Sequence, residues 1–433
     1  TLSDLLNSST VTDVIMKRRN VVSLAGAAAA YWIASCRQQG GAQPAFDFPN
    51  LSAARSPQSF TVLHAFSGPD GRVPFGSLTI SGDTLFGNTY RGGQGDYGVV
   101  FAIARDGSDY RVLHHFSGKD GREPYHKLWI KGDRLYGITK FGGNADNGVL
   151  FEMGTDGSQF RILHHFDRVD NNGSQPHAGP ILVGDRLYGT VYHGGRYRWP
   201  GAIYSYDLGN DAFELLHDFD PTQSQHPTGR LTFANDYLYG TASDFFVDNR
   251  LNRGSLFRLR LDGSEYKTLY RFQGKADSGY PYDELLFDGD RYLYGTAYGS
   301  PGQPQDSGSI YRFDTTTQNE FEVLHELGNP QTEGSKPNGS LALAPNGKLY
   351  GTTHGTNALR GDSFGSLFSM QPDGSEFEVL HRFDGGKNGD TPMRTPAIAD
   401  GILYGTTAFG GGSQTDDPNT PSGYGLIYAA ATA

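Results

Sequence analysis

A single pattern occurs seven times between Leu63 and the C-terminus, and it restricts the fold more than any other feature of the chain. With small variations, each copy runs Leu-His-x-Phe, a Gly/Asp-rich loop, Pro, a short apolar stretch, Leu-Tyr-Gly-x-Thr, Gly-Gly, Gly-x-x-Phe and usually Asp-Gly-Ser. The copies start 50 to 56 residues apart, at Leu63, Leu113, Leu163, Leu216, Leu269, Leu324 and Leu380. Self-similarity at this period is the signature of a repeat architecture.

Each copy reads as four short β-strands separated by turns. In the first copy the strands are expected at Ser77–Ile80, Thr84–Tyr90, Gly98–Ile103 and Tyr110–Phe116. Gly and Asp dominate the turns, and alternating apolar and polar residues between such turns are typical of antiparallel strands. No long helical pattern interrupts the copies. The sequence therefore predicts an all-β protein, a seven-bladed β-propeller of four-stranded antiparallel blades.

The ends of the repeat region predict how the ring closes. The last copy stops at residues 425–428 without a fourth strand, whereas residues 59–66 form an extra fourth strand ahead of the first copy. Pairing of this N-terminal strand into the last blade would cover two sheet edges that otherwise invite aggregation. We therefore expect a closed ring rather than an open solenoid.

The elements Leu-His-x-Phe, Leu-Tyr-Gly-Thr and Gly-Gly with Gly-x-x-Phe, over residues 60–428, resemble the Gloeobacter/Verrucomicrobium (GloVer) tandem repeat of bacterial surface and secreted proteins. The resemblance implies the propeller scaffold and no particular activity. Composition agrees with an all-β chain, because the sequence holds 60 Gly, 25 Tyr and 27 Phe and only 19% charged residues. We expect one large domain at residues 58–433, since the seven blades share one ring.

The N-terminal region has the features of an export signal. Met16 and the basic residues 17–19 precede a mostly apolar run over residues 21–33, which is too short to span a bilayer comfortably. Residues 33–36, Ile-Ala-Ser-Cys, resemble a bacterial lipobox. The predicted segments are an upstream extension at residues 1–15, a lipoprotein-type signal at 16–36 and a flexible tether at 37–57.

Cys36 is the only cysteine, so no internal disulfide can form. Its position favours lipidation after cleavage, and a free thiol is the alternative. The prediction is a monomer that is exported and either anchored by lipid to the bacterial cell surface or outer membrane, or secreted. A formal net charge of −11 argues against binding to nucleic acid or to anionic membranes, and leaves membrane contact to the lipid anchor alone.

The positions of the histidines distinguish residues that belong to the repeat from residues that differ between copies. Six of the thirteen occupy the repeated Leu-His step, namely His64, His114, His164, His217, His325 and His381. His115 and His165 follow directly, and all eight are expected to be structural. Five others break the pattern, namely His126, His177, His193, His226 and His354, and four of these fall in blades 2 to 4.

Two loops of each blade should emerge on one face of the ring. The residues that differ from the repeat pattern are concentrated in these loops. After the proline that starts each innermost strand, blades 2 to 5 carry Tyr125, His126, Lys127, His177, Arg230, Asp283 and Glu284, where most copies have small or neutral residues. The loop after the second strand of blade 3 carries Tyr192, His193, Arg196, Tyr197, Arg198 and Trp199. Loops at the mouth of a rigid scaffold are where function usually resides, so these residues form the candidate site.

This residue set suits β-elimination on a uronic-acid polymer. Such a reaction needs a cation to neutralise the carboxylate, a base to remove the α-proton and an acid to protonate the leaving oxygen. The predicted cation is Arg196, Arg198 or Arg230, because a guanidinium matches a carboxylate. The predicted base is His126, His177 or His193, with Tyr192 as the acid or second base. Tyr125, Lys127, Tyr197, Trp199 and Asp283 are expected to contact the sugar.

The set is similar to the active sites of propeller-type polysaccharide lyases, the ulvan and oligogalacturonate lyases among them. This resemblance concerns scaffold and residue types, and it implies a lyase acting on an anionic, ulvan-like polysaccharide. The alternative is a non-catalytic surface propeller that binds glycan or protein. Two-carboxylate hydrolysis is disfavoured because adjacent Asp283 and Glu284 point to opposite sides of a strand. No cofactor is expected, and a structural metal ion is an alternative that no ligand spacing in the sequence supports.

Overall fold

The computed structural model describes residues 60–168, 172–197, 199–220, 226–243, 253–274, 277–299, 307–317, 320–355, 364–412 and 423–432. The predicted extension, signal and tether, with Cys36, lie outside these ranges. In the described part, no helix has the length and apolar character that crossing a bilayer requires.

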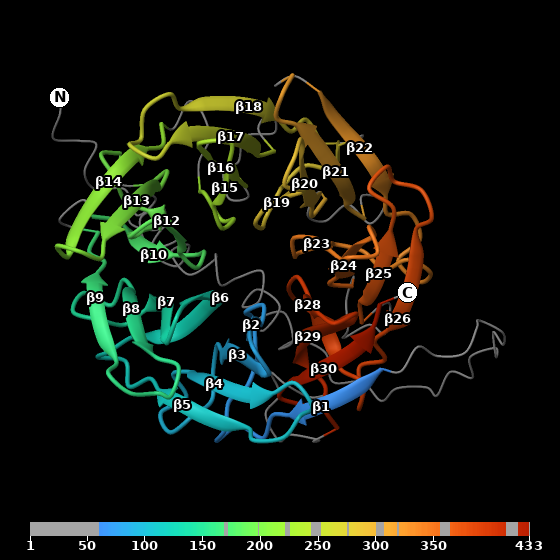
Figure 1. The fold of residues 1–433 in the computed structure, drawn as a ribbon, viewed down its shortest axis with the longest axis horizontal. Helices are drawn as coiled ribbons and strands as arrows, with labels where there is room; N and C mark the ends of the chain where they lie inside the picture. The colour runs from blue at the N-terminus through green and yellow to red at the C-terminus, as the bar shows by residue number, and fades with distance from the viewer. Residues whose placement is uncertain are drawn as a thin grey trace, which may run out of the picture. The chain divides into compact units, whose positions relative to one another are not determined.

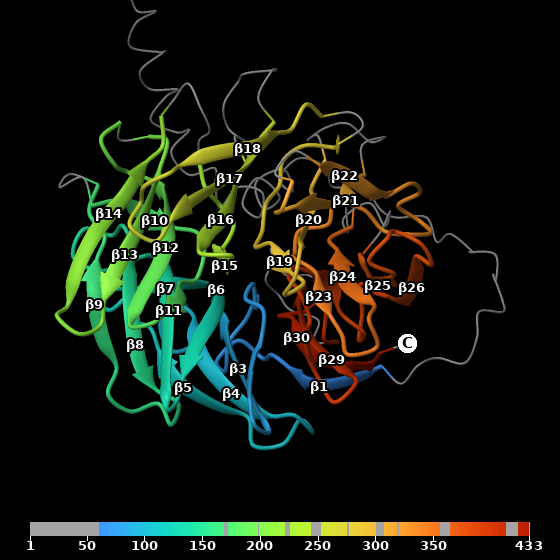
Figure 2. The ribbon, with the colours of Figure 1, turned by 45° about the horizontal axis from the view of Figure 1, so that its top comes forward.

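Seven antiparallel sheets are arranged around a central axis, as Figures 1 and 2 show. Blade 1 contains β2 (Thr79–Ser81), β3 (Thr84–Thr89), β4 (Val99–Ala104) and β5 (Arg111–His115). Blade 2 contains β6 (Arg122–Lys131), β7 (Arg134–Phe141), β8 (Val149–Gly154) and β9 (Arg161–His165). Blade 3 contains β10 (Ser174–Pro176), β11 (Ile181–Val183), β12 (Arg186–His193), β13 (Ala202–Asp207) and β14 (Ala212–Asp218).

The remaining blades follow the same order. Blade 4 contains β15 (Thr232–Ala234), β16 (Tyr237–Ala242), β17 (Ser255–Arg260) and β18 (Lys267–Arg271). Blade 5 contains β19 (Leu286–Phe287), β20 (Tyr292–Ala297), β21 (Ser309–Asp314) and β22 (Phe321–Glu326). Blade 6 contains β23 (Ala342–Leu343), β24 (Leu349–Thr353), β25 (Ser366–Met370) and β26 (Glu378–Arg382). Blade 7 contains β27 (Asp390–Pro392), β28 (Ala397–Ala399), β29 (Ile402–Phe409), β30 (Leu426–Ala431) and β1 (Thr61–Ala65).

The predicted closure of the ring is confirmed. Strand β1 pairs antiparallel with β30, with Thr61 opposite Ala429 and Val62 opposite Tyr428. The N-terminal strand thus supplies the outermost strand of blade 7, and Figure 1 shows β1 beside β30 at the join. The fold class and the predicted antiparallel strands are confirmed, with bounds in the first blade that shift by no more than two residues.

One contact joins every blade to the next and accounts for two residues of the repeat. The glycine that opens Gly-x-x-Phe lies against the proline that starts the next blade. At Gly98, for example, φ is 95° and a Cβ would lie 2.5 Å from Cδ of Pro124. The N–H before that proline donates to the carbonyl of the residue before the glycine, as Glu123 does to Tyr97 at 2.8 Å. We call this combination the interblade clamp.

The clamp occurs at all seven junctions of the ring. The other six hydrogen bonds run from Gln175 to Asn147, His226 to Pro200, Tyr280 to Arg253, Lys336 to Ser307, Thr391 to Phe364 and Val73 to Tyr424. In every copy the donor residue has a left-handed backbone, with φ between 53° and 60°. This conformation is uncommon for residues other than glycine, above all for β-branched Val73 and Thr391. Its sevenfold recurrence identifies it as part of the scaffold.

The repeated threonine and histidine also join neighbouring blades. Hydroxyls of the second strand donate to backbone carbonyls at the start of the next blade, as Thr241 does to Asp283 at 3.1 Å and Thr296 to Gly339 at 2.8 Å. The six repeated histidines stack face to face on an aromatic ring, with ring centroids 3.7 to 4.0 Å apart. His64 stacks on Tyr110 of the next blade, for example. These histidines are therefore structural.

We predict that Gly98→Ala destabilises the propeller more than Gly132→Ala does. Both glycines have positive φ, but a Cβ at Gly132 meets nothing within 4 Å, whereas one at Gly98 meets Pro124. The cost at Gly132 is the left-handed backbone alone, about 1 kcal/mol. Overpacking adds about 1 to 3 kcal/mol at Gly98. Thermal unfolding of both variants checks this, and equal shifts in Tm would contradict the clamp.

Candidate active site

Three polar side chains meet across the axis of the ring. They occupy the second position after the blade proline, where the other four blades have Gly or Ala. His126 of blade 2 places Nε2 2.8 Å from Oδ1 of Asp283 in blade 5, and Nη1 of Arg394 in blade 7 lies 3.3 Å from Oδ2 of Asp283. Blades 2 and 5 are three blades apart, the greatest separation in a ring of seven, so the contact crosses the central channel. We call these residues the axial triad.

Asp283 is the centre of the triad and is only 5% exposed. Its carboxylate also accepts the backbone N–H groups of Glu284 at 2.8 Å and of Ser340 at 3.1 Å. Burial alone would raise the pKa of Asp283, but Arg394, His126 and the Glu284 N–H outweigh it and hold that pKa well below its usual range. Asp283 is therefore an ionised carboxylate whose two oxygens both have protein partners.

His126 is neutral in this environment, because burial lowers its pKa in spite of the neighbouring carboxylate. Nε2 faces an ionised acceptor and therefore carries the proton that it donates. The backbone of His126 is left-handed, with φ 72°, and no other residue at this position of the seven blades shares that conformation. Such a backbone costs about 1 to 3 kcal/mol, so the surrounding contacts of blade 2 must hold it in place.

A second group of side chains lies at the mouth of blades 3 and 4. The ring of Tyr192 is stacked between His177 and His226, with centroid distances of 4.5 and 4.4 Å. His193 meets Tyr192 edge to face at 4.6 Å, and its Nδ1 lies 3.2 Å from the carbonyl of Trp199. All four are at most 6% exposed. We call His177, Tyr192, His193 and His226 the mouth cluster.

Local structure explains how these residues converge. Tyr192 and His193 end β12, which is longer than most second strands and carries them to the mouth. His177 directly follows the proline of blade 3, and His226 directly precedes the proline of blade 4. His226 is the donor residue of an interblade clamp, so the scaffold itself turns it toward blade 3.

The histidines of the mouth cluster are neutral at pH 7. Burial lowers the pKa of His193 to about 4 and that of His226 to about 3. Burial, with the nearby cation of Lys140, places the pKa of His177 well below its ordinary value. A neutral imidazole offers one donor and one acceptor, yet neither ring nitrogen of His177 has a hydrogen-bond partner among the described residues.

Tyr125 lies between the axial triad and the mouth cluster. Its ring centroid is 5.7 Å from His177, 5.3 Å from Cζ of Arg394 and 5.9 Å from Nζ of Lys140. Lys140, near the end of β7, is 1% exposed, and its Nζ has no hydrogen-bond partner in the described ranges. Burial lowers the pKa of Lys140 to about 8, although the carboxylate of Glu123 works in the opposite direction.

The rim beside the mouth cluster is exposed. Trp199 is 50% exposed and Tyr197 is 44% exposed, and Arg196 is also exposed. The guanidinium of Arg168 lies 4.3 Å from the ring of Trp199. Arg198, predicted to contact substrate, lies outside the described residues.

Two predicted site residues face a different space. Lys127 lines a cavity in the central channel, and it follows His126 at the point where the register of β6 is irregular. Arg230 is 1% exposed and bonds to Glu284 at 3.3 Å and to the carbonyl of Pro180 at 3.2 Å. The structure thus brings His177, Tyr192 and His193 together and connects them through Tyr125 to the axial triad. Arg230 and Lys127 do not join this group, because Arg230 bonds to Glu284 and Lys127 lines the cavity.

Sequence reasoning did not assign Lys140, His226 or Arg394 to the site. All three depart from the repeat, and His226 was already recognised as doing so. Arg394 stands out only at the second position after the proline, where it is one of three large side chains. Its contact with Asp283 depends on which blades face each other across the channel, which one copy of the repeat does not reveal.

Within the described ranges, no group of three or more His, Cys, Asp or Glu side chains is placed to hold a metal ion. The Asp-Gly-Ser turns are accounted for by their own hydrogen bonds. The carboxylate of Asp106 accepts both the N–H and the hydroxyl of Ser108, and that of Asp262 does the same with Ser264.

Comparison with known proteins identifies the family. The sequence matches the Gloeobacter/Verrucomicrobia repeat family over residues 51–199 and 185–416, so the chain belongs to this family. No curated protein matches the chain.

Among solved structures, an oligogalacturonate lyase from Vibrio parahaemolyticus is 13% identical with a TM-score of 0.52, and covers 86% of this chain and 93% of its own. An oligogalacturonate lyase in complex with manganese is 14% identical with a TM-score of 0.52, and covers 87% and 97%. A europium-containing methanol dehydrogenase is 10% identical with a TM-score of 0.49, and covers 86% and 93%. At these identities the two lyases share the fold alone.

We predict that Asp283→Ala strongly destabilises the protein. The substitution leaves the buried guanidinium of Arg394 without its counter-ion, and breaking a buried pair in this way costs about 3 to 5 kcal/mol. Asp185→Ala is the control, because Asp185 pairs with Lys131 at the surface, where such pairs contribute about 0 to 1 kcal/mol. Denaturant unfolding midpoints measure both, and a midpoint for Asp283→Ala as high as that of the control would show that the triad is not stabilising.

Proposed function

We propose that this member of the Gloeobacter/Verrucomicrobia repeat family is a polysaccharide lyase that cleaves a uronic-acid polymer by β-elimination at the mouth cluster. The propeller fold of this chain is similar to that of oligogalacturonate lyases. The lyase activity is inferred from the residues at the mouth of blades 2 to 4. The ulvan-like identity of the polymer is part of the same proposal.

One observation carries the proposal, the buried cation of Lys140 beside His177. A buried ammonium without a hydrogen-bonded partner is expensive, and buried polar groups are nearly always satisfied. Lys140 and His177 are each 1% exposed. Among the described residues, neither Nζ of Lys140 nor either ring nitrogen of His177 has a hydrogen-bond partner. A bound anionic group with oxygen acceptors, such as a carboxylate, would accept hydrogen bonds from Lys140 and from the N–H of His177. Nζ of Lys140 and the ring centroid of His177 lie 5.9 and 5.7 Å from the ring centroid of Tyr125. A uronic acid supplies that group.

The elimination would proceed with the following roles. Lys140 pairs with the substrate carboxylate and makes the adjacent α-proton more acidic, the role that sequence reasoning gave to Arg196, Arg198 or Arg230. His177 or Tyr192 removes that proton, and its electron pair forms the carbon–carbon double bond while the bond to the glycosidic oxygen breaks. The other of the two protonates the leaving oxygen. The products are an unsaturated uronate end and a new free sugar hydroxyl.

Substrate binding would also correct the low basicity of the mouth cluster. Burial and the charge of Lys140 lower the pKa of His177, and a weak base removes a proton poorly. A bound carboxylate opposes the charge of Lys140 and favours the protonated form of a nearby imidazole. The histidine would therefore gain basicity when the substrate is in place.

The exposed rim offers a surface for the rest of the polymer. Aromatic rings stack on sugar faces, and both Trp199, which packs on His193, and Tyr197 are exposed. Arg196 adds a positive charge that suits an anionic chain. The same rim would serve the rival function, a propeller that binds glycan without cleaving it, so an activity measurement has to separate the two.

We predict that the protein raises the ultraviolet absorbance of one or more polymers in a panel of galacturonate, glucuronate and mixed uronates, including ulvan. Unsaturated uronate ends absorb where the intact polymer does not. Tyr192→Phe should lower the rate at least about hundredfold, because proton transfer contributes about 10²- to 10⁴-fold. Tyr237→Phe, whose hydroxyl bonds to Glu265 in an exposed pair, is the matched control. If the absorbance rises with none of the polymers, the lyase proposal is contradicted and the non-catalytic binding function is favoured.

We further predict that activity falls as the pH rises through about 8. The pKa of Lys140 is about 8, so its ammonium is present below that pH and is lost above it. Lys140→Arg should extend activity to higher pH, because a guanidinium stays charged. A bound substrate carboxylate raises the pKa of Lys140. The alkaline fall in kcat should therefore occur at a higher pH than the alkaline fall in kcat/KM. If the activity of the original protein and that of Lys140→Arg fall at the same alkaline pH, Lys140 is not the cation that neutralises the substrate carboxylate.

A further inference from the structure

The axial triad divides the central channel into two spaces. On one side lies the mouth cluster, and on the other lies a cavity of about 600 Å³ that is lined by innermost strands of the blades. The cavity reaches residues one position from the end of the innermost strand before the first hairpin turn, such as Ile80 and Ile398, so it opens on the face opposite the mouth. None of the three triad side chains lines it. The mouth cluster and the cavity are therefore separate sites.

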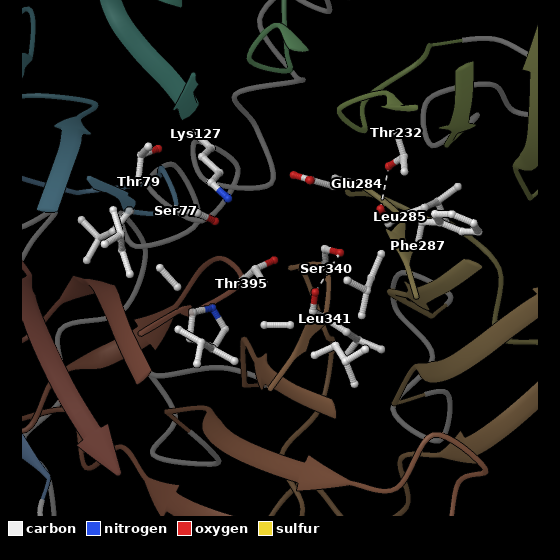
Figure 3. A pocket seen from close by; sticks show the side chains of 18 of the residues that line it. Ser77, Thr79, Lys127, Thr232, Glu284, Leu285, Phe287, Ser340, Leu341 and Thr395 are labelled. Atoms are coloured by element: carbon white, nitrogen blue, oxygen red, sulfur yellow. Dashed lines mark hydrogen bonds between the residues drawn. The ribbon is translucent and has the colours of Figure 1, made fainter. Parts of the chain in front are cut away.

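The inner part of the cavity is polar. Side chains with hydroxyl groups line it from four blades, namely those of Ser77, Thr79, Thr232, Ser340 and Thr395. The hydroxyls of Thr79 and Thr232 donate to the backbone carbonyls of Leu128 and Leu285 at 2.6 Å, and their oxygens can still accept hydrogen bonds. Figure 3 shows the amine of Lys127 and the carboxylate of Glu284 pointing into the same space from two different blades. A volume of this size holds a ligand as large as a monosaccharide with its bound water.

The charges at this inner end leave one excess positive charge. The carboxylate of Glu284 is paired with Arg230 at a nitrogen–oxygen distance of 3.3 Å. Lys127 also lies near Glu284, so the two cations share one carboxylate. Burial lowers the pKa of Lys127 in spite of the nearby carboxylate of Glu284. The balance of charge therefore favours a ligand with a single negative charge.

The outer part of the cavity is apolar. Phe233 is 39% exposed and Leu343 is 37% exposed, and both line the cavity near its opening. Phe287 lines the same wall. Flat apolar side chains around a hydroxyl-lined floor suit a sugar, whose C–H faces pack on such groups while its hydroxyls form hydrogen bonds.

We propose that this cavity is a second binding site, which takes a small hydroxylated carboxylate of monosaccharide size, such as a free uronic acid. Lys127 binds the carboxylate, and the ring of Ser and Thr hydroxyls binds the sugar hydroxyls. Glu284 accepts a further sugar hydroxyl. The site does not depend on catalysis at the mouth, so its failure and the failure of the proposed lyase activity are separate results.

Calorimetric titration with glucuronate tests this site in a Lys140→Met background, in which the mouth lacks its cation. We expect glucuronate to bind at least tenfold more tightly than glucose, which lacks the charge, and than sulfate, which lacks the sugar. Adding Lys127→Met should weaken glucuronate binding at least tenfold, whereas Lys127→Arg in the same background should retain it. Thermal unfolding of each variant verifies that the propeller is folded.

Three outcomes would overturn the proposal. Sulfate that binds as tightly as glucuronate would reduce the cavity to a simple anion site. Glucuronate binding that survives Lys127→Met would place the ligand elsewhere on the protein. The absence of any glucuronate binding in the Lys140→Met background would show that the cavity takes no such ligand.

Discussion

The interblade clamp is the contact on which the rest of this structure depends. A glycine without a Cβ lets the next blade's proline approach, and the N–H before that proline reaches back to the preceding blade at all seven junctions. The clamp fixes the start of every innermost strand, and the three residues that follow each proline decide what occupies the axis. Because blade 7 closes on blade 1 by the same contact and by the pairing of β1 with β30, the positions around the axis are set by the whole ring.

On this scaffold the axial triad separates two sites. Asp283 of blade 5 contacts His126 of blade 2 and Arg394 of blade 7, and both oxygens of its carboxylate have a protein partner. Such a saturated group is suited to closing the channel. Lys140 and His177 are also buried, but Nζ of Lys140 and both ring nitrogens of His177 have no hydrogen-bond partner among the described residues, so they are suited to receiving a ligand. The difference between saturated and unsaturated buried groups is the reason that we place the chemistry at the mouth.

Much of the fold follows from the sequence, because the repeat specifies each blade locally. The seven blades, the antiparallel strands, the closure by residues 59–66 and the structural histidines could all be predicted from one repeated pattern. The candidate site could be predicted only in part. Tyr192, His177 and His193 all belong to blade 3, and their proximity follows from that blade alone. Arg394 and Asp283 meet across the axis, and Lys127 turns away from His126 although the two are adjacent. These relations depend on the left-handed backbone of His126 within the irregular register of β6, and on which blades face each other.

The account is tested most directly by a crystal structure of the Tyr192→Phe protein soaked with a short uronate oligosaccharide that the panel identifies. We predict that one carboxylate lies within hydrogen-bonding distance of Nζ of Lys140, with the α-carbon of that sugar facing His177 and residue 192, and with a neighbouring sugar on Trp199. An oligosaccharide that lies elsewhere on the ring, or whose carboxylate does not contact Lys140, would contradict it.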